Sequence, residues 1–347
     1  MSWQWQWLWW KHLGSQTTTA KLNIIAAYSE QGELIGLAPL SLRHVKYRAG
    51  LYGMRMETLA SLWREDAAVF SEYLDFIVDR RHADAVVQRF EAALAEDSRW
   101  DDLVIAHTRS SGVAHRLRES ALGAKSYLRA LDPLEAHATA IVGNFDDYLK
   151  ALDASTRRKL WNQRKKLAAP TITFASAADI GEYLDLIDGF LESRWGWRPM
   201  SGKSRSFHLA FAAAMAGDKS LRLSRLCVDD RPISVMYNVR RGGREYNLQT
   251  GIDLANNAGI SPGYLHFGYS LENACGDGVR EFDFLAGQGR ARQYKQDFRT
   301  RSEQIVCLQF VRSRWLAMIY RAHDLLQRLR AGSRGSGERV DGEHARG

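Results

Sequence analysis

The segment from Glu245 to Phe298 decides the fold of this 347-residue chain: EYNLQTGIDLANNAGISPGYLHFGYSLENACGDGVREFDFLAGQGRARQYKQDF. Its aromatic and branched start predicts a strand, its Asn, Gly, Ser and Pro turn predicts a helix start, and its last third predicts a second strand. A helix start presents free amides and the positive end of the helix dipole, and Gly259 and Gly263 allow close backbone approach. The turn is therefore predicted to bind a phosphate group.

The composition of the chain is that of a globular protein. Hydrophobic residues make up 45% and charged residues 25% of the chain, which is ordinary for a folded domain. The length exceeds that of one core, so we expect two domains or one duplicated domain. A formal net charge of +8 favours anionic partners, such as phosphorylated cofactors, nucleic acid or an acidic membrane surface, without selecting among them.

The cysteine and histidine patterns predict no disulfide framework and no metal. Cys227, Cys275 and Cys307 lie far apart with no CxxC pair, and His208 and His266 have no partner at ligand spacing. The Trp-rich start lacks the features of a secretory signal, and no apolar stretch reaches the roughly 18 residues that span a bilayer. We expect a cytoplasmic protein and leave open a peripheral contact with an anionic inner membrane.

The order of patterns along the chain predicts an α/β (α+β) fold whose mostly antiparallel sheets are flanked by helices. Asp229-Asp230 and Gly242-Gly243 predict turns between consecutive hairpins in the second half. The expected units are an N-terminal domain at 1–143, a basic connecting helix at 144–170, a C-terminal domain at 171–310, an amphipathic helix at 311–330 and a disordered tail at 331–347.

Several short pieces occur in a characteristic order over nearly the full chain: WLWWKHLG, LIGLAPLSLR, STRRKLWNQRKKLA, ESRW, PISVMYNV, SPGYLH and EFDFLAGQGRARQYKQDF. Together they resemble the CelD-like GNAT-family acyltransferases associated with bacterial cellulose and exopolysaccharide synthesis, which are related in fold to FemAB-type peptidoglycan aminoacyltransferases. The resemblance implies two GNAT-like domains in tandem, the first degenerate. It also implies transfer from acyl-CoA, acetyl or longer, to the amine or hydroxyl of a sugar, glycan precursor or related small acceptor.

In such folds two neighbouring strands splay apart and bind the pantetheine arm, and a freed amide stabilises the thioester oxyanion. The resemblance places the first of these strands at Tyr246 to Gly251 and the coenzyme's diphosphate at the turn before the helix. A plain helix cap made by Ser261 and Pro262 is the alternative for the turn. The expected coenzyme-binding residues are Gln249, Thr250, Gly251, Asn257, Gly259, Ile260, Ser261, Gly263 and Tyr264.

Three residues are the expected catalytic groups. Asp283 would orient or deprotonate the nucleophile, or else pair with Arg280 or Lys295. Tyr294 would protonate the leaving thiolate, and Lys295 would neutralise phosphate or oxyanion charge, with a solvated surface cation as its alternative. No nucleophile elbow is present, which favours direct attack on the thioester. The expected acceptor-binding residues are Arg194, Tyr237, Tyr246 and Arg292.

The basic run STRRKLWNQRKKLAA leaves two further hypotheses open. A solvated helix face is the usual fate of such a run, but it could also hold a tRNA acceptor end, in which case aminoacyl-tRNA would replace acyl-CoA as the donor. A catalytically silent scaffold of polysaccharide synthesis is the third hypothesis, because a resemblance in fold does not establish activity.

Overall fold

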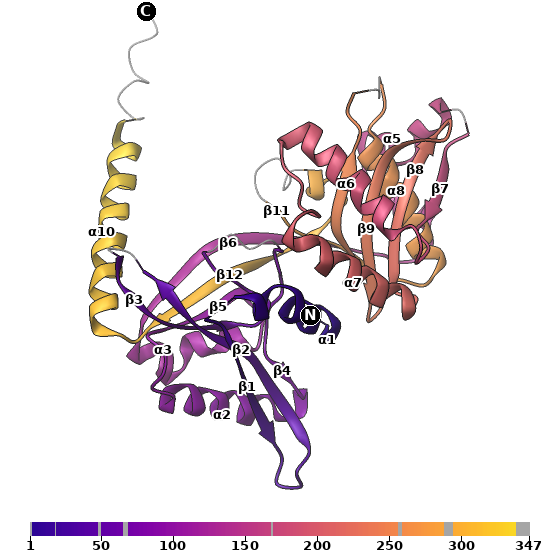
Figure 1. The fold of residues 1–347 in the computed structure, drawn as a ribbon. Helices are drawn as coiled ribbons and strands as arrows, with labels where there is room; N and C mark the ends of the chain where they lie inside the picture. The colour runs from indigo at the N-terminus through magenta and orange to yellow at the C-terminus, as the bar shows by residue number, and fades with distance from the viewer. Residues whose placement is uncertain are drawn as a thin grey trace, which may run out of the picture.

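The computed structural model describes residues 2–17, 19–47, 50–64, 69–167, 169–255, 259–287 and 294–337, with side chains up to residue 330 (Figure 1). Within these residues, twelve strands form one sheet, in which β4 (Ile77–Val78) pairs only with β2. The other strands follow one another across the sheet in the order β1 (Lys21–Tyr28), β2 (Leu34–Lys46), β3 (Tyr52–Thr58), β5 (Asp102–Arg109), β12 (Arg301–Val311), β6 (Tyr127–Ala140), β11 (Glu281–Gly287), β10 (Arg244–Ile252), β9 (Arg231–Arg241), β8 (Leu221–Val228) and β7 (Thr171–Phe174).

The two halves of the chain repeat one arrangement. In the first half, β1, β2 and β3 form an antiparallel meander, α2 (Ala83–Glu96) follows, and β5 returns parallel to β3. In the second half, β8, β9 and β10 form the meander, α8 (Pro262–Gly276) follows, and β11 returns parallel to β10. The predicted fold class, a mixed and mostly antiparallel architecture flanked by helices in both halves, is confirmed.

Strands β6 and β12 join the halves into one sheet, and Figure 1 shows both running between the two parts of the molecule. β6 pairs with β11 along one edge and with β12 along the other. β12 also pairs with β5, so residues 301–311 complete the sheet of the first half although they follow the second half in sequence. The sequence order alone did not indicate this return.

Helices cover both faces of the second half. On β9, Val235, Tyr237 and Val239 pack with residues of α6 (Ile180–Trp195) and α7 (Lys203–Gly217), whereas Met236 packs with α8. Because successive side chains of a strand point to opposite faces, α6 and α7 lie on one face and α8 on the other. The Trp-rich helix α1 (Trp3–His12) packs on α7, where Trp5 meets two phenylalanine rings edge-on.

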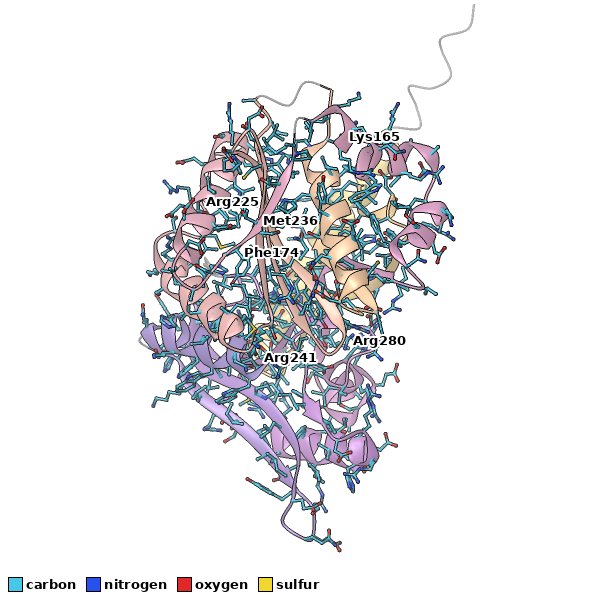
Figure 2. The ribbon with its side chains drawn as sticks, turned by 90° about the vertical axis from the view of Figure 1, so that its right-hand side faces the viewer. Lys165, Phe174, Arg225, Met236, Arg241 and Arg280 are labelled. Atoms are coloured by element: carbon cyan, nitrogen blue, oxygen red, sulfur yellow. The ribbon has the colours of Figure 1, made fainter. Side chains whose placement is uncertain are left out.

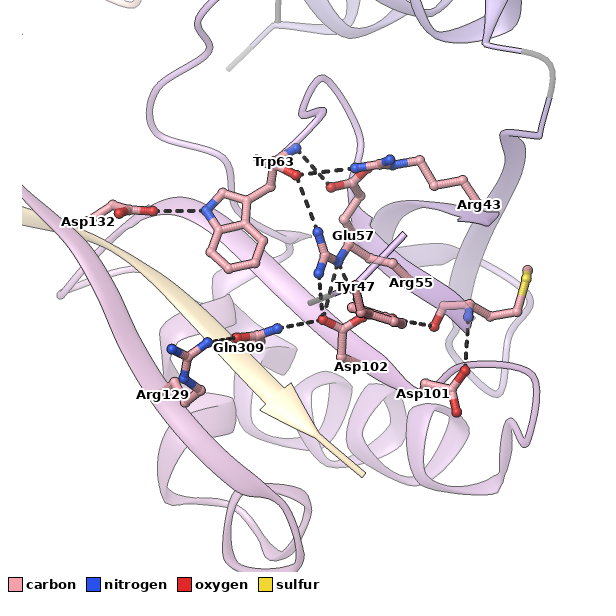
Figure 3. Close-up of polar contacts among 11 residues, drawn as sticks. Arg43, Tyr47, Arg55, Glu57, Trp63, Asp101, Asp102, Arg129, Asp132 and Gln309 are labelled. Carbon is pink, nitrogen blue, oxygen red and sulfur yellow. Dashed lines mark hydrogen bonds and ion pairs between the residues drawn. The ribbon is translucent and has the colours of Figure 1, made fainter. Parts of the chain in front are cut away.

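A buried ionic network holds the sheet of the first half together (Figure 3). Arg43 pairs with Glu57, and Arg55 Nη2 lies 2.9 Å from Asp102 Oδ2, with all four side chains at most 5% exposed. Both arginines also donate to the backbone carbonyl of Trp63, each at 3.2 Å. Removing one partner of such a pair leaves an uncompensated buried charge and costs about 3–5 kcal/mol.

Two predictions about helices need correction. The segment predicted as one basic helix contains α4 (Phe145–Ala151), α5 (Ala154–Leu160) and a 3-10 segment at Asn162–Lys166. The helix is interrupted because the Asp153 side chain accepts the Thr156 amide at 2.8 Å and so caps the start of a new helix. The last helix, α10, runs from Arg314 to Gly337 and so continues into the predicted tail, while residues 338–347 lie outside the described part.

Candidate active site

The site begins at a fork between β10 and β11. These parallel strands pair only from Arg244↔Glu281 to Tyr246↔Asp283, although β10 continues to Ile252 and β11 to Gly287. A bulge between Asn247 and Gln249 shifts the register of β10 against β9 just where the fork opens. Beyond the third pair β10 therefore lacks a partner strand on this side, and a ligand lying in the fork can pair with its backbone groups.

The equivalent place in the first half is bridged by a hydrogen bond from a backbone amide to a side chain. There, β3 and β5 also pair over only three positions, from Arg55↔Asp102 to Glu57↔Val104. Beyond them the Ala106 amide donates to Thr58 Oγ1 at 3.1 Å, and Ala106 belongs to a buried core cluster with Trp63. The fork of the second half is therefore the better candidate for a donor site.

The turn before α8 combines free amides with basic side chains. Among the described residues, none accepts a hydrogen bond from the amides of Gly263 or Tyr264, which face out of the first turn of α8. Lys166 Nζ donates to the Gly259 carbonyl at 3.4 Å, and Lys159 Nζ lies 5.1 Å from the centre of the Tyr264 ring. Positive charge from the basic run thus adds to the helix dipole at the predicted phosphate turn.

Ser261 occupies the cap position of α8, but its side chain makes no capping bond. Instead, Gln163 Oε1 accepts the Ser261 amide at 2.8 Å, so the basic segment fixes the conformation of the turn. A Cβ on Gly263 would lie 2.6 Å from Ile252 Cδ1, which explains the glycine there. Ile260 packs its side chain into an apolar cluster with Leu265, and Asn257 lies outside the described residues.

A cavity of about 440 Å³ opens on the α7 side of the fork. Figure 2 shows Arg241, at its rim, where the two halves meet, and Lys165 at the far end of the second half. Both predicted residues Tyr246 and Gln249 line the cavity. Its wall is completed by Ser2, Trp5, Val69, Phe70, Glu72, Tyr73, Trp197, Pro199, Met200, His208, Phe211, Met215, Val239, Leu248, Leu285 and Ala286.

A second cavity of about 530 Å³ adjoins the first on the side of the N-terminal half. Phe70, Glu72 and Ala286 line both cavities, so the Glu72 side chain lies at their junction. The second cavity also carries His107 and Asp132, and Asp132 accepts the Trp63 indole N–H at 3.0 Å (Figure 3). Its polar lining can hydrogen-bond a hydroxyl or amine.

Glu72 is the carboxylate best placed to take a proton. It is half-buried, and its Oε2 accepts the Ala286 amide at 2.8 Å. Removal from water raises the pKa of Glu72 to about 7, against the opposing effects of that hydrogen bond and of the Lys295 charge. A carboxylate with a pKa near the working pH is suited to general base catalysis.

Asp283, the predicted base, lies behind Glu72 rather than on the cavity wall. It is 2% exposed, and both of its oxygens accept the Tyr73 hydroxyl at 3.0 Å. Burial raises the pKa of Asp283 to about 6, and bonds from the Leu285 amide and Tyr73 oppose the rise. No ion pair with Arg280 or Lys295 occurs among the described residues. Because Tyr73 covers this carboxylate, its geometry favours a positioning role.

Lys295 is neither a surface cation nor a phosphate ligand. It is 4% exposed, and its Nζ donates to the carbonyls of Phe284, Leu285 and Ala286 at 2.7, 2.9 and 2.7 Å. Burial lowers the pKa of Lys295 to about 8, partly offset by the charges of Glu72 and Asp283. All three protons of the ammonium are used. Lys295 thus holds the end of β11 where a partner strand is missing, which corrects its predicted role.

Strained backbone gathers around these groups. Tyr73, His107, Asp132 and Leu285 have φ values of 57°, 43°, 51° and 58°, in the left-handed region that residues other than glycine rarely adopt. All four lie on the two cavities or hold a group that does. Such conformations cost about 1–3 kcal/mol each and cluster at functional sites.

The remaining predicted residues divide between the rim, the core and the fork. Arg194 is exposed and stacks on Trp195 at 4.6 Å, outside both cavity linings. Tyr237 is fully buried against α6 and α7 and lines neither cavity, so its predicted acceptor role is wrong. Tyr294 packs against Phe267, and burial raises its pKa to about 12. Arg292 lies outside the described residues.

Thr250 and Gly251 stand on the open part of β10. The Thr250 hydroxyl bonds with the Asn247 side chain, and its amide donates to Gln249 Oε1 at 3.1 Å. A Cβ on Gly251 would lie 3.0 Å from Ile187 Cα, so this glycine allows α6 to approach the strand. Tyr264 donates its hydroxyl to Asp297 at 2.6 Å, which ties the start of α8 to the segment that carries Lys295.

Comparisons with known proteins agree with this arrangement. Residues 154–296 match the family model of a GNAT acetyltransferase domain, a range that contains the basic run, β10, α8, β11 and Lys295. No curated protein matches the chain in sequence. Together with the fork, the domain match supports an enzyme of the acyltransferase class.

Solved structures share the fold at low sequence identity. The chain is similar to FemX, with a TM-score of 0.62 at 12% identity over 90% of this chain and 92% of that one. It is also similar to L-PGS from Bacillus licheniformis, with a TM-score of 0.51 at 12% identity over 84% and 85%. A C-terminal domain described as lysylphosphatidylglycerol synthetase from Agrobacterium fabrum gives 0.50 at 12% over 87% and 88%. At such identities the likeness concerns the fold.

The described residues show neither a metal-ligand cluster nor a membrane-spanning helix. No cluster of three or more His, Cys, Asp or Glu side chains with the spacing of metal ligands occurs in this part of the chain. None of its helices is long and apolar enough to cross a bilayer.

Proposed function

We propose that the protein transfers an acyl group from acyl-CoA to the amine or hydroxyl of a sugar, glycan precursor or related small acceptor. The observation that carries this proposal is the open fork beside Gln249, with a carboxylate of pKa about 7 at the junction of two cavities. A GNAT domain match over the same residues supports the choice of donor.

The donor would lie across the fork. Its diphosphate would meet the free amides of Gly263 and Tyr264, with Lys159 and Lys166 beside them. Its pantetheine arm would then run between β10 and β11 and pair with the edge of β10, as a neighbouring strand would. A backbone amide aimed at the thioester oxygen is worth about 3–4 kcal/mol in the transition state.

The reaction would proceed by direct attack. The lone pair of the acceptor nitrogen or oxygen forms the new bond to the acyl carbon, the carbon–sulfur bond breaks, and Glu72 takes the proton that the acceptor loses. Tyr294 is the proposed proton donor to the thiolate, although its raised pKa makes it a weaker acid than an ordinary tyrosine. Asp283 and Tyr73 would hold the base and the end of β11 in place through their mutual hydrogen bond.

The donor site can be tested with matched lysine variants. Lys166→Gln combined with Lys159→Gln should weaken coenzyme A binding about tenfold, because two charges near the diphosphate are lost. Lys165→Gln removes an exposed charge from the same segment and should leave binding unchanged, since Lys165 has no hydrogen bond to the described residues of the turn. Isothermal titration calorimetry measures both. Equal affinities for the two variants would place the diphosphate elsewhere.

A second candidate donor is aminoacyl-tRNA. It is favoured by six basic residues between 157 and 166 beside the α8 turn, and by the likeness in fold to FemX and L-PGS. Binding through many phosphates loses about 10³–10⁵ in affinity between 50 and 200 mM salt, whereas one diphosphate responds mildly. Strong, steeply salt-dependent tRNA binding without acyl-CoA binding would favour this donor.

The link to exopolysaccharide or cellulose synthesis rests on the sequence resemblance, and the scaffold alternative would require that no acyl donor bind to the folded protein.

A peripheral membrane contact is supported by α10. Met318, Leu325 and Leu329 recur on one stripe of this helix at 58–65% exposure, beside exposed arginines. Sedimentation with anionic vesicles should pellet the protein at low salt, and Leu325→Glu with Leu329→Glu should abolish this.

A further inference from the structure

The cavity on the α7 side is apolar away from the fork. Gln249, Leu285 and Ala286 mark the fork end, and Glu72 lies there too. Farther in, the wall is made by α1, α7 and β9, with Trp5, Phe211, Met200, Met215 and Val239 among its residues. The charged residues of the described wall are Glu72 and Arg241. Arg241 is an exposed rim residue whose Nη1 lies 3.5 Å from Asp218.

The size of this cavity exceeds what an acetyl group needs. An apolar cavity of roughly 150 Å³ already binds benzene, which has six carbons. The cavity here measures about 440 Å³. With a two-carbon acyl group at the fork, most of its apolar wall would face water, which gives up the stabilisation that burial of apolar surface provides.

Most of the polar groups lie at the fork, where a thioester would react, whereas His208 on α7 and Arg241 at the rim lie elsewhere on the wall. Glu72 belongs to both cavities, and the second cavity carries His107 and Asp132. His208 is the one histidine on the described wall of the first cavity, and burial lowers its pKa to about 4, so it is uncharged at neutral pH. One cavity thus suits an apolar chain and the other a polar acceptor, with the base between them.

We infer that the first cavity binds the acyl chain of the donor, and that this chain has roughly eight carbons or more. This rests on the proposed function and names its donor class: a medium- or long-chain acyl thioester. The acceptor then enters through the second cavity. The chemistry recognised is the acyl chain on a pantetheine thioester, whether coenzyme A or a carrier protein bears it.

Calorimetric titration with acetyl-, octanoyl- and dodecanoyl-CoA, below their micelle concentrations, tests this directly. Each buried methylene tightens binding by about two- to fourfold, so the six additional methylenes of octanoyl-CoA should make it bind at least about 50-fold more tightly than acetyl-CoA. Equal affinity for all chain lengths would overturn the inference while leaving the proposed function intact. Binding of no acyl-CoA by folded protein would instead refute the proposed function.

A second experiment uses variants that fill part of the cavity with a larger side chain. Val239→Phe adds volume on the β9 wall and should reduce the octanoyl-to-acetyl affinity ratio at least about tenfold. Val142→Phe makes the same change at a 76% exposed position that lines neither cavity, and should keep the wild-type ratio. If near-UV circular dichroism shows that Val239→Phe is misfolded, Leu248→Phe fills the same cavity from the neighbouring strand β10. An unchanged ratio in a folded filling variant contradicts the inference.

A third experiment separates the contribution of the acyl chain from that of the nucleotide that carries it. Octanoyl- and acetyl-pantetheine lack the nucleotide and its diphosphate, so both should bind more weakly than the CoA thioesters while keeping the preference for octanoyl. Loss of that preference would mean that the nucleotide end sets it, which would overturn the assignment of the cavity to the acyl chain.

Discussion

Replacing Glu72 with glutamine separates the base from the architecture around it. Glutamine keeps an oxygen that can accept the Ala286 amide, which Glu72 Oε2 meets at 2.8 Å, so the fork should stay in place. It cannot accept a proton at neutral pH. Loss of a positioned general base costs about 10²–10⁴-fold in rate, so kcat/KM should fall within that range. Thiol release from octanoyl-CoA with glucosamine as a probe acceptor measures it.

The dependence of activity on pH gives a second test of Glu72 as the general base. With a pKa of about 7, the ionised fraction of Glu72 rises about tenfold between pH 6 and pH 8. Activity of the wild type should rise by the same factor, and Glu72→Gln should lose this limb. Glu96→Gln, an exposed position at the end of α2, is the matched control and should behave as wild type. Persistence of the limb in Glu72→Gln, or a loss of less than threefold, would refute the assignment of the base.

Three further predictions concern the support of the site. Lys295→Met leaves three buried carbonyls without a donor. The free energy of unfolding measured in urea titrations should therefore fall by about 2–4 kcal/mol, and a decrease under about 0.5 kcal/mol would contradict this. Gly268→Ala places a Cβ 2.1 Å from the Leu160 carbonyl and should destabilise by about 2–3 kcal/mol, whereas Gly276→Ala in the same helix meets nothing within 4 Å and should not. Glu72 binds its proton more tightly in the folded than in the unfolded protein, so its contribution to stability falls as pH rises from about 4.5 to about 7. The stability of Glu72→Gln relative to wild type should therefore rise over that window in thermal melts, and a flat difference would argue against the raised pKa.

The parts of the fold that sequence predicted are those set by local patterns. The strand, turn and helix around Gly263 follow from turn chemistry and from alternation of side chains over a few residues. The interruption of the helix at Asp153 could also have been predicted, because an aspartate three residues before Thr156 is a helix-cap signal. The strongly basic pattern instead led to the prediction of one continuous helix. The return of β12 to the first half had no such local signal.

The contacts of Glu72 and Lys295 could not be predicted from the sequence because they join segments that are distant in the chain. Glu72 and Ala286 are 214 residues apart in the chain, and only the fold shows that they share a hydrogen bond. The burial of Lys295 depends on carbonyls that the fork leaves without a strand, which no single-residue pattern signals. Tyr237 was misassigned because it shares a face of β9 with Val239, which lines the cavity, but α6 and α7 bury it completely, and strand alternation does not reveal that burial.

The central claim is that the donor thioester lies in the fork between β10 and β11. A crystal structure of the protein with coenzyme A tests it most directly. The account predicts the sulfur between Gln249 and Leu285 and the diphosphate against the amides of Gly263 and Tyr264. An empty fork at saturating coenzyme, or a coenzyme bound on another surface, would contradict it.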